Sequence, residues 1–425
     1  MARIVLTTFG SLGDLHPFLA LALGLRARGH QPVLATSAMY RDKIEAEGVA
    51  FAPVRPDLTD FEALPELMKS VSHQRRGPEF VIRHMMMPWL RASFDDLAAA
   101  AEGADLLLTH TLTFAGPVLA ELRALPHVAV ALQPTVFFSR HDPPVLAPAP
   151  GLAALRRLGP ALYGPLFRLV RQVSDGWTRP VRALRTELGL PPPAGNPLFE
   201  GQFSRRANLA LFSPHFAAPQ PDWPPRTVAT GFAHFDRLGR EQGLADDLAA
   251  FLAAGPPPVV FTLGSSAVLD AGGFYHESAA ACARLGCRGV LLVGEDPRNL
   301  PAEPARADLH YAPYAPYGAL FPRAAAIVHS AGIGTCGQAL RAGKPLLTMP
   351  FSHDQPDNAD RLRRLGVACV IGRRAYGAAR VARELERLLT DPSYAARAAE
   401  LGAKISGEDG VARACDVLEE ALSRP

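Results

Sequence analysis

The sequence predicts an α/β protein with two halves, each a parallel sheet flanked by helices, and two observations lead to this fold class. The first 36 residues alternate between an apolar strand, a glycine-rich turn, a helix and a second strand, which is the pattern of a βαβ unit. The same order starts again near residue 257, where another apolar strand runs into Gly and Ser. A chain of 425 residues has room for two or three domains of ordinary size.

The elements of the first half follow from its apolar runs and the residues that separate them. RIVLTTF at 3–9 is apolar and rich in β-branched residues, which predicts a buried strand. Gly29 closes the amphipathic helix that comes next. The elements expected after the first strand are a turn at 10–17, a helix at 18–30, and strands at 31–37, 104–109 and 127–132.

Residues 134–200 break this alternation because they are rich in Pro and Gly, and they are predicted to be an insertion of loops and helices. Within them, residues 152–173 are basic and form short amphipathic stretches, which Pro160 and Pro165 are expected to interrupt. The arginines at 156–171 fit a solvated helix face. The alternative is an interfacial helix that contacts a membrane surface or acidic lipid.

The second half repeats the alternation of strands and helices. Its expected elements are strands at 257–263, 288–294, 324–330 and 344–350, a helix at 274–286, and another helix after the glycine-rich turn that follows 330. The expected division of the chain is an N-terminal domain at 1–218, a linker at 219–240, a C-terminal domain at 241–400, and a last helix at 401–425 that packs back toward the N-terminal domain. Open parallel sheets bind ligands at the carboxyl ends of their strands.

The composition excludes several classes of protein. Hydrophobic residues make up 48% and charged residues 20% of the chain, as in ordinary globular proteins and unlike a disordered chain. No apolar run approaches the ~18 residues of a membrane span, and no signal-like leader is expected. A net charge of +3 is too small to suggest nucleic-acid binding. The five cysteines form no CxxC pair, which predicts reduced thiols in a cytoplasmic protein.

The region around the end of the strand at 324–330 carries the clearest chemical pattern. The strand ends at His329, and Gly332 and Gly334 then allow the backbone to come close to a ligand. Thr335 opens a helix whose free N–H groups and positive dipole end make an anion site. His329 adds an imidazole beside that site; its structural alternative is a histidine bonded to backbone at the strand end.

Asp354 and Gln355 follow the end of the next strand, at Pro350. The carboxylate accepts hydrogen bonds, and the amide both donates and accepts them, so the pair suits recognition of hydroxyl groups. A plain turn is the structural alternative. An anion site at one strand end and a polyol site at the next describe the binding of a nucleotide sugar.

These motifs resemble those of the family 1 glycosyltransferases with the GT-B fold, over nearly the whole chain. HSAGIGT at 329–335 is similar to that family's donor-binding signature, with the Asp354–Gln355 pair at the family's spacing, and the segment 10–30 resembles its N-terminal acceptor-side motif. FSPHFAAPQPDWP, GFAHFD and YAPYGALFP most resemble bacterial rhamnosyltransferases of rhamnolipid synthesis and related enzymes for lipids, sterols and polyphenols. The resemblance implies two facing Rossmann-like domains, the first for the acceptor and the second for the nucleotide sugar, with a cleft between them.

The resemblance also implies the residues of the donor site. His329 would contact the pyrophosphate, and Asp354 and Gln355 would hold the sugar hydroxyls. Tyr314 falls where the family stacks a Trp on the nucleotide base, and Tyr317 falls where the family has Gln or His. These departures leave the identity of the nucleotide base undetermined. The remaining implied donor contacts are the N–H groups of Gly332, Gly334 and Thr335, a hydroxyl from Ser265 or Ser266, and Gly13.

The catalytic base departs from the pattern of many relatives, which place His where this chain has Asp14. Direct displacement at the anomeric carbon needs a group that takes the acceptor's proton. Asp14 is the first candidate, although a carboxyl of ordinary pKa, about 3.9, is a weak base unless its site is poorly solvated. Capping the following helix is its structural alternative. His16 is the second candidate, and His110, which lies where relatives place the Asp that supports a His base, could pair with Asp14.

The chain has no D-x-D triplet of carboxylates that would hold a divalent cation together with the diphosphate. Helix N–H groups and His329 can stabilise the departing diphosphate instead. We therefore expect no metal and no cofactor, with the nucleotide sugar as a co-substrate.

The predicted function is inverting, metal-independent transfer of a hexose from a UDP-glucose or dTDP-rhamnose type of donor to a hydroxyl of an apolar acceptor, such as a polyphenol or lipid. Residues 57–90, with the run Met85–Met87, and 134–200 are expected to line the acceptor pocket. A Rossmann oxidoreductase is disfavoured because Gly10 and Gly13 do not fit G-x-G-x-x-G. The remaining alternatives are a catalytically silent helper protein of the same fold and a nucleotide-sugar epimerase.

Overall fold

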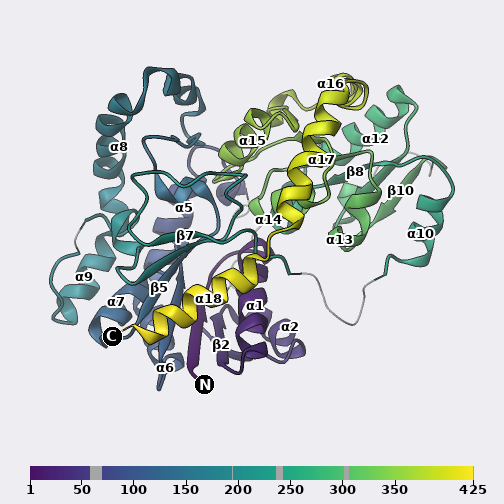
Figure 1. Ribbon diagram of the computed structural model, residues 1–425. Helices are drawn as coiled ribbons and strands as arrows, with labels where there is room; N and C mark the ends of the chain where they lie inside the picture. Colours follow the sequence, from purple (N-terminus) through teal and green to yellow (C-terminus); the bar gives the residue numbers. More distant parts are fainter. Residues whose placement is uncertain (58–68, 194, 236–242, 301–305, 425) are drawn as a thin grey trace. The chain divides into compact units, whose positions relative to one another are not determined.

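The computed structural model describes residues 1–57, 69–193, 195–235, 243–300 and 306–424. The chain forms two compact units: unit 1 is Met1–Phe235 with Glu408–Pro425, and unit 2 is Asp236–Gly407. The chain therefore leaves unit 1 once, builds unit 2, and returns to unit 1 (Figure 1). No helix within the described residues is long and apolar enough to cross a membrane.

Unit 1 is built on a seven-stranded sheet in which all neighbouring strands are parallel. The strand order is β3-β2-β1-β4-β5-β6-β7, so the direction of winding reverses between β1 and β4. The strands are β1 (Arg3–Thr7), β2 (Gln31–Thr36), β3 (Ala50–Pro53), β4 (Leu106–His110), β5 (His127–Ala131), β6 (Ala207–Ala210) and β7 (Thr227–Ala229). β3, β6 and β7 have no counterpart among the sequence predictions, and β7 lies within the segment 219–240.

Helices flank this sheet (Figure 1). They are α1 (Leu12–Ala27), α2 (Arg41–Ala46), α5 (Gly77–Phe80), α6 (Leu90–Ala100), α7 (Ala115–Leu122), α8 (Pro160–Ser174), α9 (Arg179–Glu187) and α18 (Gly410–Ser423). An apolar core joins Val5 and Leu107 of the strands to Leu97 on α6 and Leu119 on α7. Burial of such side chains is the main favourable contribution to the stability of this unit.

α1 begins at Leu12, earlier than the sequence predicts, because a capping box precedes it. Ser11 is the N-cap: its Oγ accepts a hydrogen bond from the Gly13 N–H at 3.2 Å, and its own N–H donates to Asp14 Oδ2 at 2.8 Å. These bonds satisfy backbone donors that otherwise lack partners at a helix start. The stabilisation of the helix start by these hydrogen bonds outweighs the tendency of Gly13 and Pro17 to form a turn.

The insertion at 134–200 contains α8 and α9, as predicted, but its prolines do not interrupt the first of these helices. Pro160 is the first residue of α8, where a missing N–H costs nothing, and the helix continues through Pro165.

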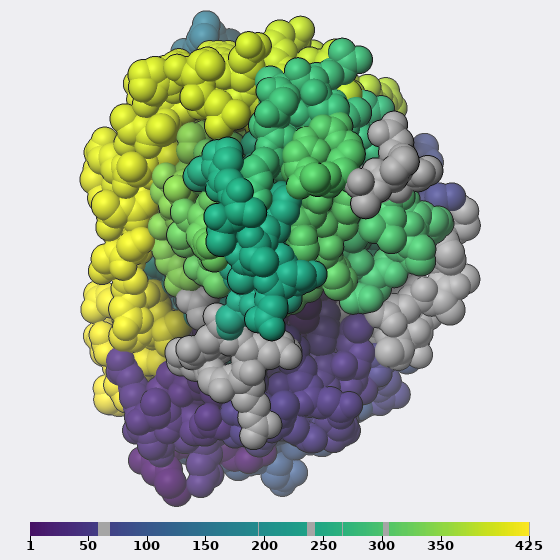
Figure 2. Space-filling model, turned by 90° about the vertical axis from the view of Figure 1, so that its right-hand side faces the viewer, coloured from purple at the N-terminus to yellow at the C-terminus, as the bar shows by residue number. Residues whose placement is uncertain are grey.

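α18 comes from the far end of the chain and lies against α1, where the C-terminal and N-terminal residues adjoin (Figures 1 and 2). Arg28 at the end of α1 donates to Asp416 and to Glu419, each at 2.7 Å. A Cβ built on Gly24 of α1 would come within 2.6 Å of Val411, so the two helices pack closely. The last helix is therefore part of the packing of unit 1.

The segments by which the chain leaves and re-enters unit 1 lie side by side. The Ser213 hydroxyl donates to Glu408 Oε1 at 2.7 Å. A Cβ built on Gly410 would lie 2.5 Å from the carbonyl oxygen of Phe232, closer than any side chain can approach. Glycine at 410 is therefore required by the contact between the two segments.

Unit 2 has a six-stranded parallel sheet in the order β10-β9-β8-β11-β12-β13, with its reversal between β8 and β11. The strands are β8 (Val259–Thr262), β9 (Gly289–Leu292), β10 (Leu309–Ala312), β11 (Ala326–His329), β12 (Leu346–Thr348) and β13 (Ala368–Val370). The helices are α10 (Asp246–Ala253), α11 (Gly264–Ala267), α12 (Phe274–Leu285), α13 (Tyr317–Leu320), α14 (Ile333–Arg341), α15 (Gln355–Arg364), α16 (Ala378–Thr390) and α17 (Pro392–Ser406). Two units with one parallel sheet each confirm the predicted fold class.

Candidate functional site

In each unit, two of the candidate residues follow the two strands between which the strand order reverses. In unit 1, Asp14 lies just after β1, and His110 ends β4. In unit 2, Ser265 lies just after β8, and His329 ends β11. Because the connections on either side of a reversal run in opposite directions, the carboxyl ends of these strands leave room for a ligand. The topology of each unit therefore places these residues where open α/β sheets bind ligands.

His329 is completely buried at the end of β11. Its Nδ1 accepts a hydrogen bond from the Ala331 N–H at 3.1 Å, so the neutral ring carries its proton on Nε2. Burial lowers the pKa of His329 to about 3, which keeps the ring neutral at physiological pH. Within the described part of the chain, Nε2 is buried and has no hydrogen-bond partner. One ring nitrogen thus supports the backbone, and the other is a desolvated donor that a bound ligand can use.

The turn after His329 leads into α14, whose N-cap is Gly332. No side chain caps this helix start, so its first N–H groups remain available to an anion. A Cβ built on Gly332 would meet no atom within 4 Å, so packing does not require glycine there. Gly334 is exposed, and Thr335 is buried on the first turn of α14. The space beside Gly332 is therefore open to a ligand.

The loops after β8 and β11 are tied together by a residue that the sequence analysis did not single out. Ser330 is buried, and its hydroxyl donates to the carbonyl oxygen of Leu263 at 2.9 Å. Gly264 adopts a φ of +74°, which carries the chain into the exposed Ser265. The side chain of the other predicted serine, Ser266, lies outside the described residues.

Tyr314 and Tyr317 have different surroundings. The Tyr314 side chain is 62% exposed, as a stacking platform for a base needs to be. Tyr317 stacks on Phe321 with 4.3 Å between ring centroids, and its hydroxyl bonds to the Thr262 hydroxyl at 2.8 Å. Burial raises the pKa of Tyr317 to about 12. Tyr317 thus fastens α13 to β8, in line with packing as the structural alternative to a contact with the base.

Asp354 and Gln355 stand at the start of α15, with Asp354 as its N-cap residue. Gln355 is buried, and its Oε1 accepts a hydrogen bond from the Phe351 N–H at 2.9 Å, so part of its amide supports the preceding turn. Burial raises the pKa of Asp354 to about 6, although hydrogen bonds from its backbone and from Asn358 favour the ionised form. The carboxyl is therefore ionised at neutral pH and can accept hydroxyl hydrogen bonds.

Asp14 in unit 1 uses its two oxygens differently. Oδ2 accepts the Ser11 N–H of the capping box at 2.8 Å, and Oδ1 lies 3.8 Å from His110 Nε2. The predicted capping alternative is thus corrected in detail, because Ser11 is the N-cap and Asp14 is the third residue of α1. The side chain of Asp14 keeps 26% of its exposure, whereas that of His110 keeps 1%. A partly solvated carboxylate beside a buried imidazole can take up a proton from an approaching ligand.

The two histidines near Asp14 are not equivalent. Burial lowers the pKa of His110 to about 4, so at neutral pH the contact with Asp14 joins a carboxylate to a neutral ring. His16 is half-buried, and its ring packs beside Phe235 with 5.0 Å between centroids. Gly13 is the second residue of α1 and donates to Ser11. The structure therefore brings Asp14 together with His110, as the pairing hypothesis requires.

Gly10→Ala is expected to disturb this site. Gly10 has a φ of +136°, and a Cβ there would lie 2.1 Å from Asp14 Oδ2. We expect the variant to lose about 1–3 kcal/mol in free energy of unfolding beyond the loss in Gly29→Ala, measured by denaturant titration. Gly29 is the matched control, because it also has a positive φ, +84°, but its Cβ would meet nothing within 4 Å. Equal losses in the two variants would contradict the predicted collision.

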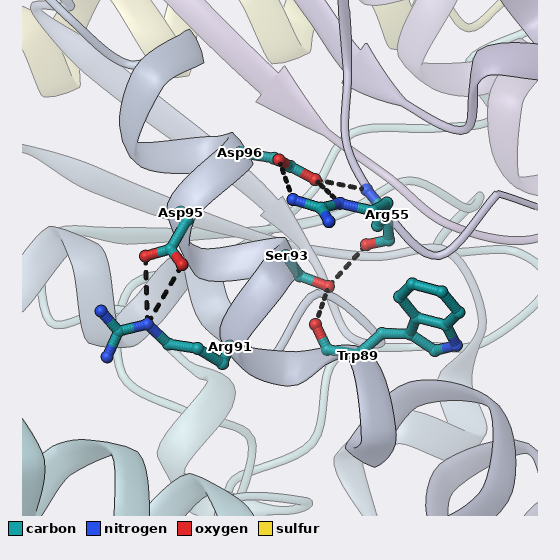
Figure 3. A network of polar contacts seen from close by, with 6 residues as sticks. All are labelled: Arg55, Trp89, Arg91, Ser93, Asp95 and Asp96. Carbon is teal, nitrogen blue, oxygen red and sulfur yellow. Dashed lines mark hydrogen bonds and ion pairs between the residues drawn. The ribbon is translucent and has the colours of Figure 1, made fainter.

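A crevice opens in unit 1 at the ends of β1 and β4, lined by Thr8, Phe9, Arg55, Met86, Leu90, Ser93, Leu112 and Phe114, among others. Its wall is held by α6: Arg55 forms a bidentate pair with Asp96, and the Ser93 hydroxyl donates to the carbonyl oxygens of Arg55 and Trp89 (Figure 3). The three methionines at 85–87 are buried in the core of unit 1, and Met86 reaches the crevice. The expected acceptor segment 57–90 includes residues 58–68, which lie outside the described residues.

Metal-ligating side chains do not gather at these strand ends. Among the described residues, no group of three or more His, Cys, Asp and Glu side chains is arranged to hold a metal ion. The polar groups described at the start of α14 include backbone N–H groups and one neutral imidazole, which suit an anion.

Comparisons with known proteins agree with this geometry. Residues 4–102 match the family model described as glycosyltransferase family 28 N-terminal domain, and residues 294–417 match erythromycin biosynthesis protein CIII-like, C-terminal domain. The chain is 35% identical to O-mycaminosyltylonolide 6-deoxyallosyltransferase of Streptomyces fradiae, over 98% of this chain and 97% of that relative. It is also 27% identical to a sterol 3-beta-glucosyltransferase of Gibberella zeae, over 99% of this chain and 29% of the fungal protein.

Solved structures resemble the whole chain. Spinosyn forosaminyltransferase aligns with a TM-score of 0.72 at 19% identity and covers 100% of both chains. Spinosyn rhamnosyltransferase complexed with thymidine diphosphate aligns with a TM-score of 0.68 at 19% identity, over 99% of this chain and 100% of the other. At these identities the likeness establishes the fold.

Proposed function

This chain belongs to the family 1 glycosyltransferases of GT-B fold, and we propose on that premise that it transfers a hexose from a nucleotide diphosphate sugar to a hydroxyl of an apolar natural product, with inversion at the anomeric carbon. The 35%-identical relative is by name an O-mycaminosyltylonolide 6-deoxyallosyltransferase, and one structural neighbour is complexed with thymidine diphosphate. These favour a dTDP-deoxysugar as donor, with UDP-glucose as the second candidate.

The observation that carries the proposal is the buried Nε2 donor of His329 beside the start of α14. A desolvated N–H without a partner is costly, and a phosphate oxygen is the ligand that satisfies it together with the helix N–H groups. Asp354 and Gln355, at the end of the neighbouring strand, supply acceptors and donors for sugar hydroxyls. The site therefore suits the diphosphate and sugar of a donor molecule.

In the proposed mechanism, Asp14 removes the proton from the acceptor hydroxyl while its oxygen attacks the anomeric carbon from the side opposite the diphosphate. The His110 ring, whose Nε2 lies 3.8 Å from Asp14 Oδ1, stays neutral at physiological pH because burial lowers its pKa to about 4. The diphosphate leaves toward His329 and the N–H groups of α14, which stabilise its developing charge. One-step displacement of this kind inverts the configuration of the sugar.

The function is tested by incubating the chain with dTDP-deoxysugars, dTDP-glucose or UDP-glucose and with macrolide, polyphenol or hydroxy-lipid acceptors, followed by mass spectrometry. Nucleotide diphosphate release that depends on the acceptor, together with a glycosylated product, is expected. A helper protein would release no nucleotide diphosphate, and an epimerase would change the donor sugar without any acceptor, so either pattern would overturn the proposal.

Metal chelation is expected to leave the rate unchanged, because the leaving diphosphate is stabilised by N–H donors. Initial rates with excess EDTA and with added magnesium should agree within about twofold. A large loss with EDTA that magnesium restores would mean that a cation neutralises the diphosphate.

A basic apolar surface on unit 1 supports a further part of the proposal, contact with an anionic membrane. Leu158, just before α8, and Leu162, Leu169 and Val173 on it are 67%, 38%, 56% and 68% exposed. The spacing of seven and four residues places Leu162, Leu169 and Val173 on one face of α8, named here the α8 stripe. Residues 150–182 carry six arginines and one carboxylate, Asp175, which pairs with Arg182 at 2.6 Å. Glu200, from outside this segment, pairs with Arg171 at 2.6 Å.

The positive charge of residues 150–182 favours anionic lipid over a second copy of the chain as the binding partner of the α8 stripe. A second copy of the chain would bring two strongly basic surfaces together, whereas anionic lipid attracts them and accepts the leucines. Co-sedimentation is expected to show at least ~10-fold stronger binding to phosphatidylglycerol-containing vesicles than to pure phosphatidylcholine, weakening as salt rises. Leu169→Gln/Val173→Gln should lose that binding.

The matched control for this test is Leu122→Gln/Leu389→Gln, which changes two leucines that are also about two-fifths exposed, at 41% and 42%. It should bind vesicles like the wild type. Dimers that the α8 double variant dissociates, seen by light scattering without vesicle binding, would identify a self-association surface and overturn the membrane contact.

A further inference from the structure

One buried amide connects the two groups of candidate donor-binding residues in unit 2. Asn358 lies on α15 and has no exposed surface. Its Nδ2 donates to the carbonyl oxygen of Ala331 at 3.0 Å and to Asp354 Oδ2 at 2.6 Å. Both partners are acceptors, so only the NH2 group of the amide can face them. The side chain of Asn358 therefore bridges the turn after β11 and the carboxylate before α15.

The turn held by Asn358 adopts a backbone conformation that side-chain-bearing residues avoid. Ala331 has a φ of +64°, in the left-handed region that favours glycine. Its N–H is bonded to His329 Nδ1 at 3.1 Å, and its carbonyl oxygen is bonded to Asn358. Both polar groups of Ala331 are thus fixed, which keeps the turn in the shape that leads into Gly332 and α14.

We propose that Asn358 is a positioning residue, which sets the phosphate-binding turn and the sugar-binding carboxylate relative to each other. The inference rests on the proposed function, because it assigns those two roles to His329 with the α14 start and to Asp354. Asn358 acts through Ala331 and Asp354 and needs no contact with the donor itself. Removing its amide should weaken binding of the sugar-bearing donor more than binding of the nucleotide alone.

The ionisation of Asp354 provides a readout that loss of packing would not move. Burial raises the pKa of Asp354 to about 6, hydrogen bonds from its backbone and from Asn358 oppose this rise, and the nearby Asp357 adds to it. On α14, burial raises the pKa of the Cys336 thiol well above its usual value, with Asp354 contributing, so the thiol is neutral. On β11, burial keeps His329 neutral.

The direction of the expected shift follows from these contacts. The Asn358 amide stabilises the charged carboxylate, so its loss raises the pKa of Asp354 further above 6. Only the ionised form accepts hydrogen bonds on both oxygens, and donor binding fades as the pH falls through that pKa. In Asn358→Leu, the loss of donor binding should therefore begin at a higher pH than in the wild type.

The experiment compares Asn358→Leu with the matched control Asn208→Leu by calorimetry from pH 5.5 to 8.5. Asn208 is also a buried amide, in unit 1, and its Nδ2 donates to the carbonyl oxygens of Ser204 and Pro225, each at 3.0 Å. The probes are dTDP-glucose or UDP-glucose, whichever the wild type binds, and the corresponding nucleoside diphosphate. Asn358→Ala serves as a second variant if the leucine is not accommodated.

At pH 7, Asn358→Leu should bind the nucleotide sugar at least ~10-fold more weakly than the wild type, on the scale of a lost hydrogen bond to a charged group, with a smaller change for the nucleoside diphosphate. The pH at which this variant loses donor binding on acidification should rise by about one unit. Asn208→Leu should stay within about twofold of the wild type for both probes.

The outcomes separate the two claims. In one outcome, the wild type binds and turns over the donor, and both Asn358 variants match Asn208→Leu in their affinities for the two probes and in the pH dependence of binding. That outcome overturns the positioning role of Asn358 and leaves the proposed function standing. If the wild type neither binds nor turns over any nucleotide sugar, the proposed function itself is overturned.

Discussion

Asp14→Asn is expected to lower kcat for alcohol acceptors by at least ~100-fold, because an amide cannot take the acceptor's proton. The variant should fold normally, since the Asn side-chain oxygen can still accept the Ser11 N–H that Asp14 Oδ2 now accepts at 2.8 Å. Acceptor-dependent nucleotide release measures the rate. Melting temperature and donor affinity should both stay near the wild-type values.

Rates with acceptors of different acidity show whether Asp14 acts as the catalytic base or only supports the structure. A phenol with a pKa near 10 should regain rate in Asp14→Asn as the pH rises, because it ionises without help, whereas an aliphatic alcohol should not. His16→Ala should keep substantial activity, since that ring packs beside Phe235. An active Asp14→Asn together with an inactive His16→Ala or His110→Ala would mean that a histidine takes the proton.

His329→Ala is the second substitution with a large expected effect, a loss of at least ~100-fold in kcat. It removes the Nε2 donor that we assign to the leaving diphosphate and the Nδ1 acceptor that holds Ala331. Because burial lowers the pKa of His329 to about 3, its protonation should contribute no pH dependence between pH 5 and 9 in the wild type.

The matched control for this loss is His127→Ala. Burial also lowers the pKa of His127, to about 4, and its Nε2 bonds to the Thr109 hydroxyl at 2.6 Å in unit 1. We expect this variant to have a lower melting temperature with a rate within about threefold of the wild type. Near-normal turnover in a folded His329→Ala would refute the assignment of that residue.

The sequence predicts those parts of the fold and site that depend on local pattern. The apolar runs of β1 and β8 and the glycine-rich turn after His329 have clear signals because each is short and continuous. β7 and β13 are only three residues long, too short for a periodic pattern to identify them. The sequence pattern predicts the start of α1 too late, because Gly13 and Pro17 are strong turn signals, and the capping box that overrides them involves only Ser11 and Asp14.

Contacts between distant segments set the limit of sequence-based prediction at the site. Asn358 binds Ala331, 27 positions away, and Ser330 binds Leu263, 67 positions away, through folds of the chain that no local pattern encodes. The different surroundings of Tyr317 and Tyr314 also depend on burial, which their places in the sequence motif do not reveal. The Asp14–His110 pair could be predicted as a hypothesis from the family resemblance, because His110 lies where relatives place the Asp that supports a His base.

The return of the chain into unit 1 determines how parts of this enzyme can be exchanged with those of relatives. Unit 2 is inserted between two segments that touch, at Phe232 and Gly410, so it can be replaced as one cassette, Asp236–Gly407, with both junctions left in place. A chimera that joined a foreign C-terminal half at a single crossover would also replace α18 and lose the pairing of Arg28 with Asp416. Exchanging unit 2 therefore calls for two crossovers, and the glycine at 410 should be kept in every hybrid.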